Sequence, residues 1–140
     1  MNSNNQVKTT TVHGHRVDDK RMAFETSAGN EFIVGEDASP GEYMLGSVAA
    51  CYNLIGHMVA EEMGLNIQDL HVSVAGDIDP RKYKGDPTDS RAGYQELRVA
   101  IDIDANADSA TLDAWLTAVQ DRCPVCDNVV TATATTTIIS

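Results

Sequence analysis

Three cysteines are the residues of this 140-residue chain best suited to covalent chemistry. Cys51 stands alone in an apolar stretch, whereas Cys123 and Cys126 frame the motif Cys-Pro-Val-Cys. Proline is favoured at the first position of a helix, so Cys123 is expected at a helix start and Cys126 within the first turn. Unpaired backbone N–H groups and the helix dipole favour a thiolate there, and a thiolate is the nucleophile of redox chemistry. A redox-active thiol is therefore the first hypothesis.

Residue types alone leave four interpretations of these cysteines open. A Cys-x-x-Cys pair can close a small disulfide ring, as in thioredoxins, although here the motif follows a predicted helix instead of a strand. A zinc site could draw on the cysteines and on four histidines, yet only one cysteine pair has ligand spacing. A third interpretation is a long-range pair of Cys51 with Cys123, and a fourth is that the cysteines are small buried apolar residues. The four histidines are His13, His15, His57 and His71.

The longest predicted element places Cys51 in the middle of a helix. Ser39 is a suitable N-cap before a proline, and Glu42 completes a capping box. The helix is expected to run to about Met63 and to end at Gly64, which can adopt a left-handed conformation. Because its apolar residues occupy every side, most of its surface must be buried, against a sheet and a second subunit.

The other patterns predict strands on both sides of this helix and a pair of helices near the C-terminus. A polar loop over residues 80–93 separates two of the strands. This order indicates an α+β fold, because regular βαβ alternation is missing. We expect a disordered tail at residues 1–6 and one domain over residues 7–140. The expected strands are Val7–His15, Lys20–Ser27, Glu31–Val34, Leu70–Ile78, Tyr94–Ile103 and Thr131–Ile139, and the expected helices are Ser109–Arg122, capped by Ser109, and Val125–Val130.

Composition restricts the partners of the chain. With 21 acidic and 10 basic residues, the formal net charge is -11, which argues against nucleic acid and anionic membranes as partners. No apolar run approaches the roughly 20 residues that span a bilayer. The polar N-terminus does not have the pattern of a signal peptide. We therefore expect a cytoplasmic protein with reduced thiols.

Two motifs occur together at well-separated places in the chain. The segment from Ser39 to Leu45 leads to Ala49–Ala50–Cys51, with Cys51 eleven residues after Pro40, and Cys123–Pro124–Val125 follows near the C-terminus. In combination they resemble the osmotically inducible protein C / organic hydroperoxide resistance (OsmC/Ohr) family, over essentially the whole chain from about Lys8 to Ile139. The resemblance implies antiparallel sheets around a long buried central helix, in an intertwined homodimer.

The resemblance also implies a thiol-dependent peroxidase that acts on organic hydroperoxides in oxidative-stress defence. Cys51 would attack the peroxide and become a sulfenic acid, and Cys123 would condense with it to a disulfide. A dithiol, dihydrolipoamide in the Ohr branch, would reduce that bond, without a metal or bound organic cofactor. Cys126, where serine is common, is either a spare resolving thiol or a serine-sized substitution. The alternative function is a non-catalytic stress dimer whose cleft binds an apolar small molecule.

Members of the family use an arginine to stabilise the thiolate and a glutamate to orient that arginine. Arg16 is the best match for the arginine, and Arg21 is the alternative. Glu42 is the carboxylate at the helix start, and it either orients the arginine or only caps the helix. It lies nine residues before Cys51, about 180° round an ideal helix, whereas Gly41 holds the ten-residue spacing of the Ohr branch.

Overall fold

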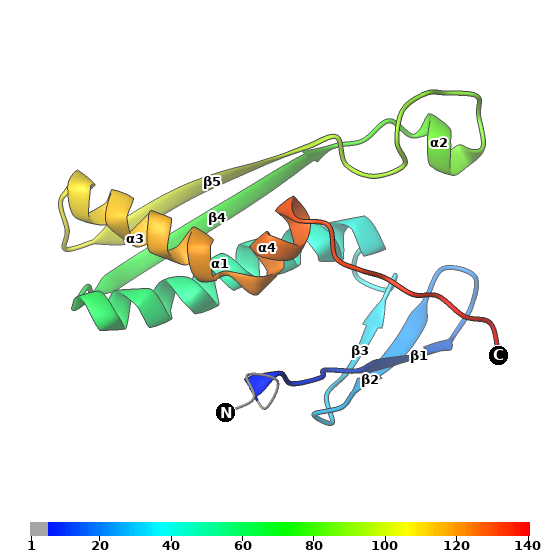
Figure 1. Ribbon diagram of the computed structural model, residues 1–140, viewed down its shortest axis with the longest axis horizontal. Helices are drawn as coiled ribbons and strands as arrows, with labels where there is room; N and C mark the ends of the chain where they lie inside the picture. The colour runs from blue at the N-terminus through cyan, green and yellow to red at the C-terminus, as the bar shows by residue number, and fades with distance from the viewer. Residues whose placement is uncertain (1–5) are drawn as a thin grey trace. The chain divides into compact units, whose positions relative to one another are not determined.

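The computed structural model describes residues 6–140, which belong to two compact units, Met1–Met44 and Leu45–Ser140 (Figure 1). Of the predicted disordered tail over residues 1–6, only Gln6 is among the described residues, and it is exposed. The rest of that prediction lies outside them.

The first unit contains a three-stranded antiparallel sheet with the order β1-β2-β3, formed by the three strands that the sequence predicts before the long helix. Its inner strand β2 pairs Phe24 with Gly14 on one side and with Phe32 on the other. The first strand is shorter than predicted, because regular pairing begins only at Val12. The strands are β1 (Val12–Arg16), β2 (Met22–Thr26) and β3 (Glu31–Val34).

Helix α1 (Pro40–Met63) begins and ends where the sequence predicts. The Ser39 N–H donates to Glu42 Oε1 at 3.0 Å, and the Glu42 N–H donates to Ser39 Oγ at 3.2 Å. This reciprocal pair is a capping box, which satisfies two backbone donors that a helix start leaves unpaired. Gly64 follows the helix with φ of 71°, the left-handed conformation of a C-cap glycine.

The second unit is a long antiparallel hairpin covered on one face by helices. Alternate residues of both strands, such as Val72 and Ile101, pack with the buried faces of α1 and α3. The sequence missed α2, a single turn in the loop that Figure 1 shows beyond the end of the hairpin. The elements are β4 (Ile67–Asp77), α2 (Arg81–Lys84), β5 (Glu96–Ala105), α3 (Ser109–Arg122) and α4 (Pro124–Val130).

Only one face of α1 is buried within the chain itself. Val59 is 1% exposed and packs with Trp115 and Val119 of α3, whereas Leu54 and Met58 on other sides are 64% and 47% exposed. The all-round burial expected from the sequence is therefore not met by this one chain. Burial of the remaining apolar side chains in a homodimer stays a prediction.

Two local predictions are wrong. Residues 132–140 form no strand, because no strand of the second unit pairs with them, and β-branched composition cannot replace a hydrogen-bonding neighbour. Helix α3 is capped by Asp108 and not by Ser109: the Asp108 carboxylate accepts a hydrogen bond from the Thr111 N–H at 2.8 Å. Aspartate is as good an N-cap as serine, and here it lies one residue earlier.

Candidate functional site: a buried thiol cluster

The second unit brings two cysteines together that are 72 residues apart in the chain. The Cys123 thiol donates to Cys51 Sγ at a sulfur–sulfur distance of 2.8 Å, and both side chains are free thiols. Cys51 is 8% exposed and Cys123 is 1% exposed. A sulfenic acid formed on one sulfur would therefore meet the other without any large movement of the backbone.

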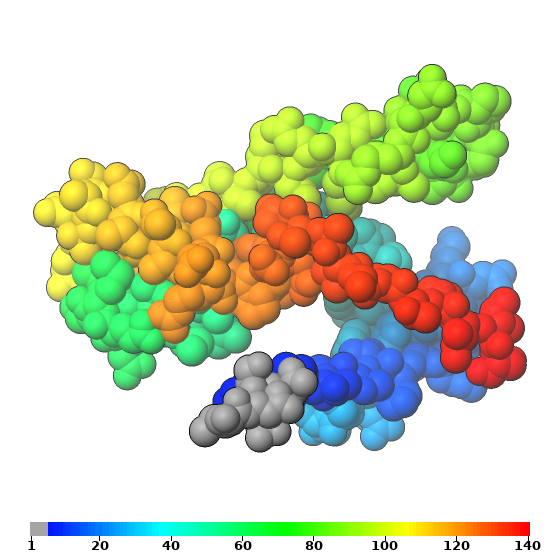
Figure 2. Space-filling model, viewed as in Figure 1, coloured from blue at the N-terminus to red at the C-terminus, as the bar shows by residue number. Residues whose placement is uncertain are grey.

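Two contacts between α1 and α3 position this pair. The indole N–H of Trp115 donates to the Gly56 carbonyl oxygen at 2.8 Å, deep in the core. Near the end of α3, Arg122 pairs with Glu62, with one N–O distance of 3.1 Å. Figure 2 shows the orange surface of α3 and α4 against the green part of α1. Because these contacts hold α3 along α1, they place Cys123, the residue that follows α3, next to Cys51.

The turn between α3 and α4 directs backbone N–H groups at both sulfurs. Cys123 has extended backbone angles and is the N-cap of α4, with Pro124 in the first turn. Its Sγ accepts a hydrogen bond from the Cys126 N–H at 3.4 Å, and Cys51 receives one from the Val125 N–H. These donors stabilise negative charge on sulfur, as expected at a helix start.

Burial nevertheless dominates the acidity of the pair. Loss of solvent raises the pKa of Cys51 and of Cys123 above the ordinary value of a thiol, and the backbone N–H groups only partly offset this. In the single chain, burial therefore outweighs the stabilisation that the helix start gives to a Cys123 thiolate. No cationic side chain of residues 45–140 is among the groups that counteract this effect of burial.

A third thiol and a phenol complete the cluster. Cys126 is partly buried, and its side chain interacts with the Cys123 sulfur and with the Tyr52 hydroxyl. Tyr52 is 5% exposed, burial raises its pKa, and Gln120 hydrogen-bonds to its hydroxyl. Gln120 is not among the site residues predicted from the sequence. Its place three residues before Cys123, one helical turn away, was the available signal.

The predicted charged residues belong to the first unit, where each has a local partner. Arg16 pairs with Asp19 at 2.6 Å, and the Arg16 side chain is 66% exposed. Arg21 is held more firmly, by Asp18 at 2.9 Å and Glu36 at 3.2 Å. Glu42 closes the capping box, and the hydrogen bond that its carboxylate accepts from the Ser39 N–H lowers the pKa of Glu42.

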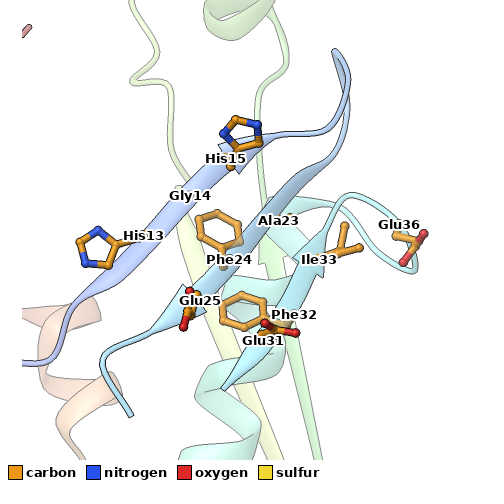
Figure 3. A pocket seen from close by; sticks show the side chains of 10 residues that line it. All are labelled: His13, Gly14, His15, Ala23, Phe24, Glu25, Glu31, Phe32, Ile33 and Glu36. Atoms are coloured by element: carbon orange, nitrogen blue, oxygen red, sulfur yellow. The ribbon is translucent and has the colours of Figure 1, made fainter. Parts of the chain in front are cut away.

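The first unit also has an open depression of about 670 Å³ on its sheet. Figure 3 shows the rings of Phe24 and Phe32 side by side in it, with His13 and His15 from β1 nearby. The two rings stack with centroids 5.1 Å apart. The depression contains none of the four predicted site residues, so it gives no support to their chemistry.

Among residues 6–140, no group of three or more His, Cys, Asp or Glu side chains is arranged to hold a metal ion. No helix in the described part of the chain is long and apolar enough to cross a membrane.

Comparison with known proteins identifies the family of the chain. The sequence model of the OsmC-like proteins matches residues 34–138, three quarters of the chain. The chain belongs to the OsmC-like protein family. The matched region contains both Cys51 and Cys123 but not Arg16. A comparison with curated proteins finds no match.

Solved structures of OsmC-like proteins share the fold. An OsmC-like protein from Mycoplasma pneumoniae superposes with a TM-score of 0.76 at 17% identity, covering 89% of both chains. An organic hydroperoxide resistance protein from Elizabethkingia anophelis gives 0.59 at 12% identity, covering 88% of this chain and 89% of that one. A Legionella pneumophila organic hydroperoxide resistance protein gives 0.56 at 14%, covering 88% and 90%. At these identities the likeness is one of fold, and it confirms the predicted OsmC-like α+β class.

Proposed function

We propose that the protein is a thiol-dependent peroxidase that reduces organic hydroperoxides. The observation that carries the proposal is the contact of the Cys51 and Cys123 sulfurs at 2.8 Å inside an apolar core. Family membership and the organic hydroperoxide resistance proteins among the structural neighbours support the same chemistry. Arg16 and Glu42 are the proposed supporting residues.

In the first step, the Cys51 thiolate attacks one oxygen of the peroxide and the O–O bond breaks. Cys51 becomes a sulfenic acid, and the alkoxide takes a proton and leaves as an alcohol. The Val125 N–H, which hydrogen-bonds to Cys51, would stabilise the thiolate before attack. Cys51 is the proposed nucleophile because it matches the reactive cysteine that the family resemblance implies, and it is the more exposed of the two paired thiols, 8% against 1% for Cys123.

In the second step, the Cys123 thiol attacks the Cys51 sulfenic acid, releasing water and forming a disulfide. An external dithiol such as dihydrolipoamide then donates two electrons and two protons, restoring both thiols and becoming a disulfide itself. This cycle needs no metal or bound organic cofactor. We propose that it runs in the reducing cytoplasm, in a homodimer that covers the exposed apolar side chains of α1.

The test treats reduced protein with one equivalent of cumene hydroperoxide, with hydrogen peroxide in parallel, and maps disulfides by mass spectrometry. We expect a Cys51–Cys123 disulfide that forms faster with the organic peroxide. Cys51→Ser is the matched control, because it removes the nucleophile and keeps the rest of the core.

The competing function is a non-catalytic dimer that binds an apolar small molecule. One feature of the sequence favours it: Gly41 holds the position ten residues before Cys51 at which the Ohr branch has its glutamate. Thiols that stay reduced in the presence of both peroxides would decide for this alternative.

A further inference from the structure

The three sulfurs of the thiol cluster differ in their access to solvent. Cys123 is 1% exposed and Cys51 is 8% exposed, whereas Cys126 is only partly buried. Reduction of a disulfide requires an attacking thiolate to reach one of its sulfur atoms. A Cys51–Cys123 disulfide would therefore be difficult to reach for any dithiol that comes from outside the chain. The proposed cycle lacks a route from this buried bond to its reductant.

Cys126 is placed to supply that route. It lies in the first turn of α4, three residues after Cys123, which is the N-cap of that helix. The Cys126 N–H donates to Cys123 Sγ at 3.4 Å, and the Cys126 side chain interacts with the same sulfur. A Cys-x-x-Cys pair at a helix start can close a small disulfide ring. The Tyr52 hydroxyl, which also interacts with Cys126, can donate a hydrogen bond to its thiolate.

We propose that Cys126 is a relay thiol that moves the disulfide from the buried Cys51–Cys123 pair to the more accessible Cys123–Cys126 pair. This inference rests on the proposed function for the origin of the first disulfide. The Cys126 thiolate attacks Cys123 Sγ, the Cys123–Cys51 bond breaks, and a Cys123–Cys126 bond forms. The proton lost by Cys126 ends on Cys51. The number of disulfides is unchanged, and the external dithiol then reduces the new one.

The environment of Cys51 favours the product of this exchange. Burial raises the pKa of Cys51, so the neutral thiol is its stable form in the core. The exchange returns Cys51 to that form and leaves it ready for the next peroxide. It also places the oxidised bond at the start of α4, the part of the cluster with the most solvent access.

The first experiment tests the relay pair without any peroxide. Cys51→Ser protein, which keeps only Cys123 and Cys126, is equilibrated over a range of reduced and oxidised glutathione. The thiols are trapped with N-ethylmaleimide, and the bonds are mapped by mass spectrometry. We expect an intramolecular Cys123–Cys126 disulfide, in Cys51→Ala protein as well. Mixed disulfides with glutathione alone, at every ratio and in both variants, would overturn the proposal.

The second experiment follows the transfer in the wild-type protein after one equivalent of diamide or of cumene hydroperoxide. We expect the Cys51–Cys123 bond to appear first and then to decline as Cys123–Cys126 rises and Cys51 becomes alkylatable. In Cys126→Ser protein the first bond should persist, and dihydrolipoamide should reduce it at least about tenfold more slowly. A persistent Cys51–Cys123 bond in the wild type, reduced as quickly as in Cys126→Ser, contradicts the relay.

The two oxidants separate the relay from the peroxidase. If diamide produces the transfer but cumene hydroperoxide leaves Cys51 reduced, the proposed function fails and the relay stands. If both oxidants leave Cys51 joined to Cys123 while Cys126 remains a free thiol, the peroxidase stands and the relay fails.

Discussion

The thiols of the second unit and the arginines of the first unit have opposite environments. Cys51 and Cys123 are packed among apolar side chains, touch each other, and have pKa values raised by burial. Arg16 is exposed and Arg21 is partly exposed, and each pairs with a carboxylate three residues away. Packing alone brings two sulfurs together, but it does not supply the positive charge that a reactive thiolate needs.

Removing one of the two buried thiols should have the largest effect on peroxide consumption. We expect Cys51→Ser to lower peroxide consumption by about 10³-fold or more, because the nucleophile is lost. Cys123→Ser should still give a sulfenic acid on Cys51, which a dimedone-type reagent can trap. Mass spectrometry of the trapped adduct distinguishes the two roles. An adduct on Cys123 in the Cys51→Ser variant would mean that Cys123 is the nucleophile and Cys51 the resolving thiol.

Arg16→Met tests whether the first unit supplies the missing charge. We expect the rate of Cys51 oxidation to fall by about 10- to 100-fold, as for loss of a hydrogen bond to a charged group. Arg16 is the better candidate because, among the described residues, it pairs with a single exposed carboxylate, that of Asp19, whereas Arg21 is held by two carboxylates. Stopped-flow oxidation between pH 6 and 9 measures this. Arg21→Met is the matched control; a larger effect there would exchange the roles of the two arginines.

Gly56→Ala should weaken the packing that joins the sulfurs. A Cβ at Gly56 would lie 2.7 Å from Cζ2 of Trp115, so the indole must shift. Such overpacking costs about 1–3 kcal/mol of stability. Gly46→Ala is the control within the same helix, because its Cβ would meet no atom within 4 Å. The free energy of unfolding, measured in urea with reduced protein, should fall for Gly56→Ala and rise slightly for Gly46→Ala. Equal behaviour of both variants would mean that Trp115 does not depend on this close approach.

The sequence and structure agree best where local signals and packing act together. The capping box at Ser39 and Glu42 and the stop at Gly64 are local, and they define α1 correctly. The alternation of apolar and polar residues along β4 and β5 also predicted the hairpin, because one face of the hairpin is buried. The segment Thr131–Ile139 has strong β propensity, but a strand needs a partner that composition does not provide.

The candidate site was less predictable than the fold. A cysteine at a helix start is a local signal for a thiolate, but the pKa of Cys123 depends on burial by residues far away in the chain. The contact of Trp115 with Gly56 is likewise a long-range event, 59 residues apart. The proximity of Cys51 to Cys123 was anticipated through the family resemblance and not from spacing.

Raised thiol pKa values also predict how stability depends on pH. In the unfolded chain the cysteines ionise near their ordinary pKa, roughly 8.5, whereas the folded Cys51 and Cys123 ionise higher. The two neutral thiols therefore make their full contribution to the free energy of unfolding below the pKa of the unfolded chain. This contribution is lost as the pH rises from that value through the higher pKa of the folded protein. Urea unfolding of reduced protein at pH 7 to 10 should show this loss, and it should be smaller in a Cys51→Ala variant. A curve that stays level up to pH 10 would mean that another group holds the thiolates in the folded state.

Glu42→Gln is the mildest change and separates the two roles of Glu42. The glutamine oxygen can still accept from the Ser39 N–H, so the helix start should survive and stability at pH 7 should change little. The Ser39 N–H lowers the pKa of Glu42 in the folded protein. Ionised Glu42 therefore stabilises the wild-type fold above the pKa that Glu42 has in the unfolded chain, and this stabilisation is lost as the pH falls through its lower pKa in the folded protein. That acid-side loss should shrink in the variant when urea midpoints at pH 6 and pH 3 are compared. If Glu42 only caps the helix, the rate of Cys51 oxidation stays the same. If Glu42 orients Arg16, the rate falls. Adding Arg16→Met to Glu42→Gln then lowers the rate little further, because the two residues act as one unit.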